Sequence, residues 1–211
     1  MDSGTTRSRK RGSYHHGDLK RALVDEAAKM IEERGDWTFS MRELAARIGV
    51  SPMATYSHFS DKTELLATIA EEGFRELEAR TRTASEAADE AEDAMFECGL
   101  AYIMFGLERP ARYRLMFGAT FAVSQPPALR AACDDAYSVL TDKIEQCAPD
   151  GGWPAGEAET RALQAWAKVH GFTMLMIDRP ARRLDEIGTA PDDVRPLAEA
   201  ILKLSDTEMS H

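Results

Sequence analysis

Long apolar stretches are missing from this sequence. The longest, residues 98–107, is about half the length that a transmembrane helix needs. The N-terminus carries basic residues, but no apolar segment follows them, so the pattern of a secretory signal peptide is absent. These absences favour a chain that works in the cytoplasm without contact to a membrane.

Cysteine is scarce as well. The chain has three, Cys98, Cys133 and Cys147, an odd number at wide spacings. Such a set indicates reduced thiols in a cytoplasm, because a disulfide framework needs an even number of partners. A redox-sensing role for one of them is an alternative, but inert buried thiols are far more common.

The motifs of catalysis are also lacking. The sequence contains no Ser/Cys–His arrangement of a nucleophilic enzyme, no phosphate-binding glycine loop and no helix with a carboxylate–histidine metal set. Its acidic residues have the pattern of solvated surfaces. We therefore expect no enzymatic activity, no metal and no cofactor.

Positive charge is in deficit overall but unevenly distributed. The 211 residues hold 26 Lys and Arg against 36 Asp and Glu, a net charge of −10. Residues 1–62 hold 11 basic against 9 acidic side chains, whereas residues 63–211 hold 15 against 27. The basic excess is concentrated in RSRKR, residues 7–11. A polarised molecule of this kind suits an N-terminal unit that meets a polyanion, although a solvated tail has the same composition.

What the sequence does contain is helical periodicity along nearly its whole length. In the first helix, Leu19, Leu23, Ala27 and Ile31 recur at helical spacing. Gly35 follows where a C-terminal cap belongs. No segment has the alternation of a strand, so the pattern predicts an all-α protein.

The residues FSMREL give a strong local signal for a second helix. Ser40 can cap it, and Glu43 three residues later can return the bond. Gly49 suits the left-handed turn that ends this helix. Ser51 caps the next helix, and Pro52 stands at its first position, where a missing N–H does no harm. Two short helices joined by a glycine turn are typical of a helix–turn–helix.

The second of these short helices has an unusual outer face. Thr55 and Phe59 are expected to point inward. A solvated surface helix would carry Lys and Glu on its outside, whereas this face has little charge and no bulk. It is shaped to enter a major groove and to read base edges and thymine methyl groups. The outward set is Pro52, Met53, Ala54 and Ser57.

Three segments together resemble the tetracycline-repressor (TetR) family of bacterial one-component regulators. They are GSYHHGDLKRAL, FSMRELAARIGVSPMATYSHFSDKTELL and AWAKVHG. The last is similar to the branch with a Trp-His-Gly motif, here Trp166, His170 and Gly171. The resemblance implies an all-α homodimer with three N-terminal DNA-binding helices. It places the DNA-binding domain in residues 1–64 and a helical dimerisation and effector-binding domain in residues 65–211.

The same resemblance explains the clustered histidines near the N-terminus. His15, His16 and Asp18 have the look of a metal site, but no cysteine or second histidine follows at ligand spacing. The family's own lead-in to the first helix accounts for them better.

The resemblance also implies which residues meet DNA. Tyr56 and Lys62 match a phosphate-contacting pair that anchors the recognition helix without reading sequence. Ser40 lies at a helix N-terminus, which favours a phosphate, and Arg42 can reach a guanine edge or a phosphate. The basic N-terminal arm could lie in the adjacent minor groove. The predicted set is Arg9, Lys10, Arg11, Ser40, Arg42, Ser51, Pro52, Met53, Ala54, Tyr56, Ser57, His58 and Lys62.

The rest of the chain is rich in methionine and aromatic residues. Such side chains line adaptable apolar pockets, but they also fill ordinary cores, which is the commoner case. Following the resemblance, we expect an effector pocket lined by Met95, Tyr102, Met104, Phe105, Met116, Phe117, Phe121, Trp166, His170 and Met174.

Two C-terminal helical patterns suggest a dimer interface. Gly171 sits in the middle of a helix, at a cost of about 1 kcal/mol relative to alanine, as happens where another helix approaches closely. For His170 we expect a bond within the core or the interface, with a place in the pocket as the alternative. The predicted interface is Gly171, Leu175, Asp178, Val194, Leu197, Ala198, Ile201 and Leu202.

Two functions follow from this reading. The first is a homodimeric transcriptional repressor that binds a palindromic operator and is released by a small apolar or amphipathic effector. The alternative is an effector-independent DNA-binding dimer that organises DNA or recruits a protein partner. A ligand that shifts both thermal stability and DNA affinity would favour the first, because such coupling defines an allosteric switch.

Overall fold

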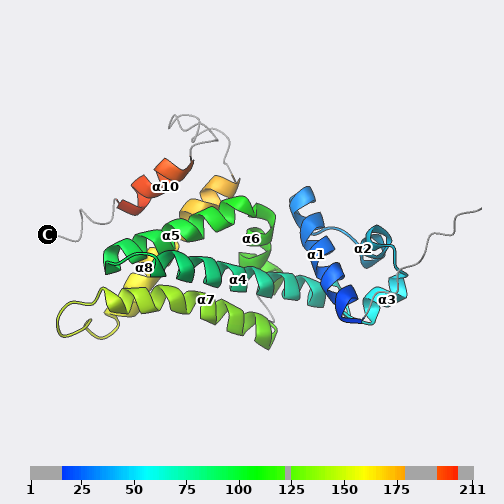
Figure 1. Ribbon diagram of the computed structural model, residues 1–211, viewed down its shortest axis with the longest axis horizontal. Helices are drawn as coiled ribbons and strands as arrows, with labels where there is room; N and C mark the ends of the chain where they lie inside the picture. Colours follow the sequence, from blue (N-terminus) through cyan, green and yellow to red (C-terminus); the bar gives the residue numbers. More distant parts are fainter. Residues whose placement is uncertain (1–15, 122–124, 179–193, 204–211) are drawn as a thin grey trace, which may run out of the picture.

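The computed structural model describes residues 16–121, 125–178 and 194–203, and these residues contain helices but no strand. The all-α prediction is therefore confirmed for the described chain. A small N-terminal unit stands at one end of a larger helical body, and one long helix runs from the first into the second (Figure 1). None of the described helices is long and apolar enough to cross a membrane.

From residue 16 onward, the N-terminal unit consists of three helices followed by the start of the long one. α1 packs against α2, and α2 packs against α3 across a tight turn. The long helix, α4, then continues from this unit between α5 and α7 of the body. The helices are α1 (His16–Arg34), α2 (Met41–Ile48), α3 (Pro52–Tyr56) and α4 (Lys62–Glu86).

The body wraps around the C-terminal part of α4. α5 and α7 flank α4, α8 packs on α5 and α7, and α10 lies on the outer side of α5 (Figure 1). The short helix α6 contacts α1, α4 and α5. The elements are α5 (Ala91–Glu108), α6 (Pro110–Phe117), a 3-10 turn (Ala119–Phe121), α7 (Pro127–Gln146), α8 (Glu157–Asp178) and α10 (Val194–Lys203).

The local signals of the helix–turn–helix are confirmed. The Ser40 hydroxyl accepts a bond from the Glu43 N–H at 3.2 Å, and the Ser51 hydroxyl accepts one from Ala54 N–H at 3.3 Å. Gly49 has φ of 75°, the left-handed conformation that glycine adopts without strain. Asp61 caps α4 in the same way, through Glu64 N–H at 2.9 Å. Each cap satisfies a backbone donor that the helix itself leaves open.

One apolar core runs through both parts of the molecule. Phe39, Phe59 and Leu65 are buried at the N-terminal end, and Phe105 and Tyr113 are buried in the body, all within one cluster. The predicted boundary at residues 64/65 falls inside α4, so both parts share this helix. The division into two domains stays a prediction.

α5 and α8 approach each other closely at Gly106. A β-carbon placed on Gly106 would collide with the Thr173 methyl group of α8 and would lie 3.0 Å from the Tyr113 ring. Thr173 is fully buried, and its hydroxyl is fixed by a bond to the Val169 carbonyl at 2.7 Å. The crossing of these two helices therefore depends on the missing side chain.

We predict that Gly106→Ala lowers the free energy of unfolding by about 1–3 kcal/mol, the range for overpacking a filled core. Urea denaturation followed by circular dichroism measures the change. The double variant Gly106→Ala/Thr173→Ser removes the colliding methyl group but keeps the hydroxyl, and should recover part of the loss. A single variant as stable as the wild type would show that the crossing is not tight.

Candidate functional site

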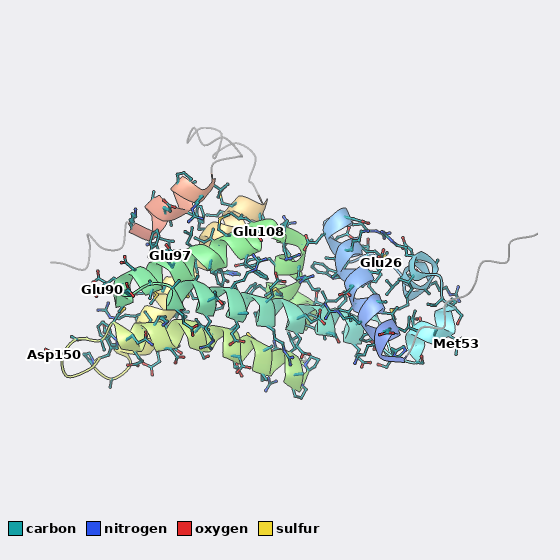
Figure 2. The ribbon with its side chains drawn as sticks, in the orientation of Figure 1. Glu26, Met53, Glu90, Glu97, Glu108 and Asp150 are labelled. Atoms are coloured by element: carbon teal, nitrogen blue, oxygen red, sulfur yellow. The ribbon has the colours of Figure 1, made fainter. Side chains whose placement is uncertain are left out.

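The outer face of α3 forms an exposed tip of the molecule. Figure 2 shows Met53 at the far end from Asp150. The Met53 side chain is 77% exposed, and Tyr56 beside it is 48% exposed. Thr55 and Phe59 are buried as predicted, and the Thr55 hydroxyl donates to the Pro52 carbonyl at 2.7 Å. The five-residue helix α3 thus exposes the apolar Met53 side chain to solvent, while the buried side of the helix packs against the rest of the protein.

The other predicted contact residues surround this tip. Pro52 and Ser57 are exposed, whereas Ala54 and His58 are half-buried. Ser40, Arg42 and Ser51 are exposed at or near the starts of α2 and α3. The predicted basic residues Arg9, Lys10 and Arg11 lie outside the described residues. The described members of the set therefore share one end of the molecule.

Lys62 is placed differently from the expectation of an outward phosphate contact. Its ammonium group donates to the Trp37 carbonyl and lies 4.7 Å from the centre of the Phe39 ring. Burial lowers the pKa of this lysine. In the free protein Lys62 thus ties the start of α4 to the loop between α1 and α2, a contact that sequence spacing does not reveal.

Ion pairs brace the helices of the N-terminal unit. Arg47 of α2 lies 2.6 Å from Glu26 and 2.8 Å from Glu33, both on α1. The hydrogen bond from Arg47 holds the pKa of Glu33 below its ordinary value. Arg34 pairs with Glu43 in the same way across the α1–α2 junction. These arginines orient the two helices, which distinguishes them from Arg42.

A hydrogen-bonded aromatic cluster lies in the body between α5, α6 and α8. The Tyr113 hydroxyl donates to the Tyr102 hydroxyl at 2.8 Å and lies 2.7 Å from Nδ1 of His170. The Trp166 indole N–H donates to the Tyr102 hydroxyl at 3.2 Å. The Phe117 ring packs among them, with its centre 4.8 Å from that of His170 and 4.7 Å from that of Tyr113. We call these five residues the aromatic cluster.

The aromatic cluster is uncharged near neutral pH. Burial raises the pKa of Tyr102 to about 12 and raises that of Tyr113 further. Burial also lowers the pKa of His170, because a charged imidazole loses solvation in this setting. The polar atoms of the cluster therefore act as neutral hydrogen-bond donors and acceptors.

The predicted effector-pocket residues are only partly brought together. Tyr102, Phe117, Trp166 and His170 meet in the aromatic cluster. Met116 lies under α4 against Gly73 instead. Phe105 and Phe121 are buried in the core, and Met95 and Met174 are half-buried. The predicted set omits Tyr113, the most deeply buried member of the cluster, because composition does not show which tyrosine reaches the histidine.

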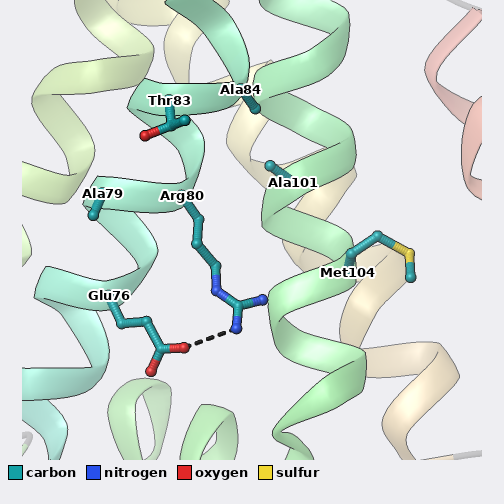
Figure 3. A pocket seen from close by; sticks show the side chains of 7 residues that line it. All are labelled: Glu76, Ala79, Arg80, Thr83, Ala84, Ala101 and Met104. Carbon is teal, nitrogen blue, oxygen red and sulfur yellow. Dashed lines mark hydrogen bonds and ion pairs between the residues drawn. The ribbon is translucent and has the colours of Figure 1, made fainter.

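An open groove of about 490 Å³ lies elsewhere, between α4 and α5 (Figure 3). Arg80 stands in it, 2.9 Å from Glu76 and 2.6 Å from Glu108, so it is already paired with carboxylates of the protein. Of the predicted pocket residues it contains Met104 alone. The aromatic cluster offers more hydrogen-bond donors and acceptors than this groove, and is therefore the stronger candidate for an effector site. The groove is lined by Glu76, Ala79, Arg80, Thr83, Ala84, Ala101 and Met104.

The predicted dimer residues divide into outward and inward groups. Leu175 is 56% exposed, and the space beside Gly171 is open for at least 4 Å around an added β-carbon. Ala198 is fully buried in its own chain, and Leu202 packs against Gly99 of α5. Asp178 pairs with Arg114 at 2.8 Å, and Val194, Leu197 and Ile201 are half-buried.

Several residues with structural importance escape sequence reasoning. Glu32 connects the N-terminal unit to α6 of the body by accepting the Arg112 N–H, and the Trp37 ring lies near Gly118 at the end of that helix. Neither residue belongs to a motif, and Glu32 and Arg112 are 80 positions apart in the sequence. Among the described side chains, no three His, Cys, Asp or Glu residues are grouped to hold a metal ion.

Two segments of the chain match known protein families. Residues 23–69 match the family described as bacterial regulatory proteins, tetR family, and residues 95–203 match the tetracyclin repressor-like, C-terminal domain. The uncharacterized HTH-type transcriptional regulator YobS of Bacillus subtilis (strain 168) is 22% identical over 176 residues, covering 81% of this chain and 85% of YobS.

Solved structures share the fold over almost the whole chain. A protein of unknown function from Rhodococcus sp. RHA1 is 28% identical with a TM-score of 0.75, and the match covers 91% of this chain and 97% of that one. AibR, solved with isovaleryl coenzyme A and operator DNA, is 17% identical with a TM-score of 0.63, covering 88% and 96%.

For the aromatic cluster we predict a pH dependence that belongs to His170. Its pKa is about 6.5 in the unfolded chain and lower in the folded protein. The unfolded state therefore binds more protons below about pH 6.5, and the free energy of unfolding falls from there toward the folded pKa. Above pH 6.5 this contribution is constant.

Urea titrations of the wild type and of His170→Gln between pH 7.5 and 5.5 measure this difference. The variant has no titrating group at the position, so its stability should fall less over the range. Equal slopes for the two proteins would contradict the assignment of a neutral, half-buried imidazole with a lowered pKa.

Proposed function

The chain belongs to the tetR family of bacterial regulatory proteins and is a DNA-binding transcriptional regulator; we propose that it represses transcription as a homodimer on a palindromic operator until a small effector releases it. The observation that carries the proposal is α3, a capped helix whose exposed face presents Met53 and little charge. Members of this family are regulators, and we propose no catalytic activity. We place its action in the cytoplasm, where chromosomal DNA lies.

The proposed DNA contacts follow from exposure at the α3 end. Pro52, Met53, Ala54 and Ser57 would read base edges, since apolar and hydroxyl groups suit thymine methyl groups and base acceptors. Tyr56 would anchor the helix on a phosphate, with Ser40, Arg42, Ser51 and His58 beside it. Lys62 could join them only by leaving the Trp37 carbonyl. The basic residues Arg9, Lys10 and Arg11 would add sequence-independent attraction.

The proposed dimer forms through the outer side of α8. Leu175 is exposed beside the open surface at Gly171, and an apolar side chain at such a place gains by meeting a second copy. Leu163, 56% exposed on the same helix, extends this surface. Two recognition helices related by a two-fold axis suit half-sites about one helical turn apart. Ala198 and Leu202 pack α10 against its own chain and are not part of this surface.

The proposed effector site is the aromatic cluster. Its donors and acceptors are neutral, and the rings around Phe117 offer an apolar setting. This chemistry suits a small apolar or amphipathic molecule. AibR, which shares the fold, was solved with both a ligand and its operator. We propose the same pairing of functions here, with residues 1–64 binding DNA and residues 65–211 sensing the ligand.

Selection of bound sequences from a random DNA pool, at two salt concentrations, tests the proposal. A specific dimer should return a palindromic motif whose affinity falls by no more than its phosphate contacts require, about 0.9 log units per contact for each tenfold rise in salt. Binding without a motif would contradict sequence reading by α3. A motif that the protein binds with an affinity unchanged by any small molecule tested would favour the effector-independent alternative.

We predict that Met53→Ala weakens binding to the selected operator by roughly 1 kcal/mol, about fivefold in affinity, because an apolar base contact is lost. Binding to random DNA and the salt slope should stay unchanged, since methionine carries no charge. Fluorescence anisotropy with both DNAs measures the effect. Thr83→Ala, at an exposed position of α4 in the body, is the control. Equal losses on operator and random DNA would argue against a reading role.

We predict that Leu175→Glu converts the dimer to a monomer at micromolar concentration, because two carboxylates would be buried in an apolar contact. Sedimentation velocity measures the state. Operator affinity should fall on the order of a hundredfold, since the second half-site is no longer bound intramolecularly. Thr83→Glu adds the same charge on an exposed part of the body as a control. A dimeric Leu175→Glu protein would place the interface elsewhere.

A further inference from the structure

The first turn of α6 has no cap of its own. Arg109 occupies the N-cap position with φ −134° and ψ 59°, and its side chain makes no capping bond. Pro110 follows at the first helical position. The next backbone N–H groups, those of Ala111 and Arg112, therefore need partners from outside the helix.

Glu32 of α1 provides both partners. One carboxylate oxygen accepts the Arg112 N–H at 2.9 Å, and the other accepts the Ala111 N–H at 3.3 Å. A carboxylate at a helix N-terminus is also attracted by the positive end of the helix dipole. The DNA-binding end of the molecule thus caps a helix of the body through one side chain.

The other side chains of α6 fasten it to the body. Arg112 lies 3.0 Å from Glu76 of α4, and Arg114 lies 2.8 Å from Asp178 of α8. The Tyr113 hydroxyl reaches His170. Three consecutive residues therefore connect α6 to α4 and α8. Through α6, the Glu32 carboxylate is linked to both of these helices of the body.

The Trp37 ring lies near the other end of α6. A β-carbon placed on Gly118, directly after the helix, would stand 4.0 Å from the Trp37 ring of the α1–α2 loop. The Trp37 carbonyl is in turn held by Lys62 at the start of α4. α6 stands beside α1 in Figure 1 and packs against it.

Attachment through α4 alone would leave the N-terminal unit free to pivot. A single helix fixes direction along its axis, whereas a second contact away from that axis is needed to restrain bending and rotation. The Glu32 carboxylate is such a contact, because α1 and α6 meet to the side of α4.

We propose that Glu32 is a positioning residue for DNA binding: by capping α6 it fixes the orientation of the DNA-binding end on the body, and hence the separation of the two α3 helices in the dimer. The inference rests on the proposed dimeric, operator-binding function. It assigns to one carboxylate a role in selecting the spacing between half-sites, which is separate from contact with bases or phosphates.

The test uses the full-length protein and a set of operators whose half-sites are separated by the selected spacing or by one or two base pairs more or fewer. Each added base pair moves a half-site by about 3.4 Å and rotates it about the duplex axis, so a rigid dimer discriminates between them. Affinities are measured for the wild type, Glu32→Ala and Glu32→Gln. Glu71→Ala is the matched control, because among the described residues Glu71 has one ion pair, with Arg75 one turn along the same helix.

We expect the wild type and Glu71→Ala to prefer the selected spacing by about tenfold over a one-base-pair change, and Glu32→Ala to prefer it by no more than about threefold. Glu32→Gln keeps a single acceptor oxygen and should fall between them. Affinity for a DNA with one half-site should be the same in all four proteins, because the reading face is intact. Thermal unfolding confirms that each variant is folded, and Glu32→Gln carries the test if the alanine variant is not.

A wild-type spacing preference that survives in both Glu32 variants would overturn the positioning role while leaving the regulator intact. A reduced affinity for the single half-site in the Glu32 variants would also overturn it, since the defect would then lie in the DNA-binding end itself. A wild-type protein with no spacing preference at all would instead contradict the proposed dimeric function.

Discussion

Helix α4 is the constraint on which the other elements depend. It is one unbroken helix from Lys62 to Glu86, and its buried side chains, from Leu65 to Ser85, face α1 at one end and α5, α6 and α7 along the rest. The N-terminal unit cannot close its core without the first turns of α4, and the body cannot close its core without the remainder. The two parts are therefore joined by one continuous helix, and α6 adds contacts between them to the side of that helix.

The short helix α6 concentrates these side contacts in a few residues. Arg112 presents its N–H to Glu32, Tyr113 reaches His170, and Arg114 pairs with Asp178. Phe117 ends the same helix among the rings of the aromatic cluster. A molecule that entered between those rings would contact Tyr113 and Phe117, which belong to the helix that Glu32 caps. The proposed effector site and the proposed positioning contact are thus two faces of one element, which gives the regulator a physical link that does not run through α4.

The features predictable from sequence are those set by neighbouring residues. Ser40, Gly49 and Ser51 act on backbone groups within a few positions, so their caps and turn follow from local chemistry alone. The inward side of α3 follows from helical spacing in the same way. The contacts of Glu32 with α6, and of Tyr113 with His170, join distant positions and depend on how the helices cross. No periodicity distinguishes those residues from their neighbours. For the same reason the sequence did not reveal that Ala198, which we predicted at the dimer interface, is buried within its own chain.

Hydroxyl-radical footprinting of the selected operator tests the central claim most directly, since it reports where a symmetric pair of α3 helices sits on DNA. The account predicts two protected segments of equal strength on one face of the duplex, with centres about 34–36 Å apart, one per protomer. A single protected segment, or continuous protection without two-fold symmetry, would contradict a dimer that places two recognition helices in successive major grooves.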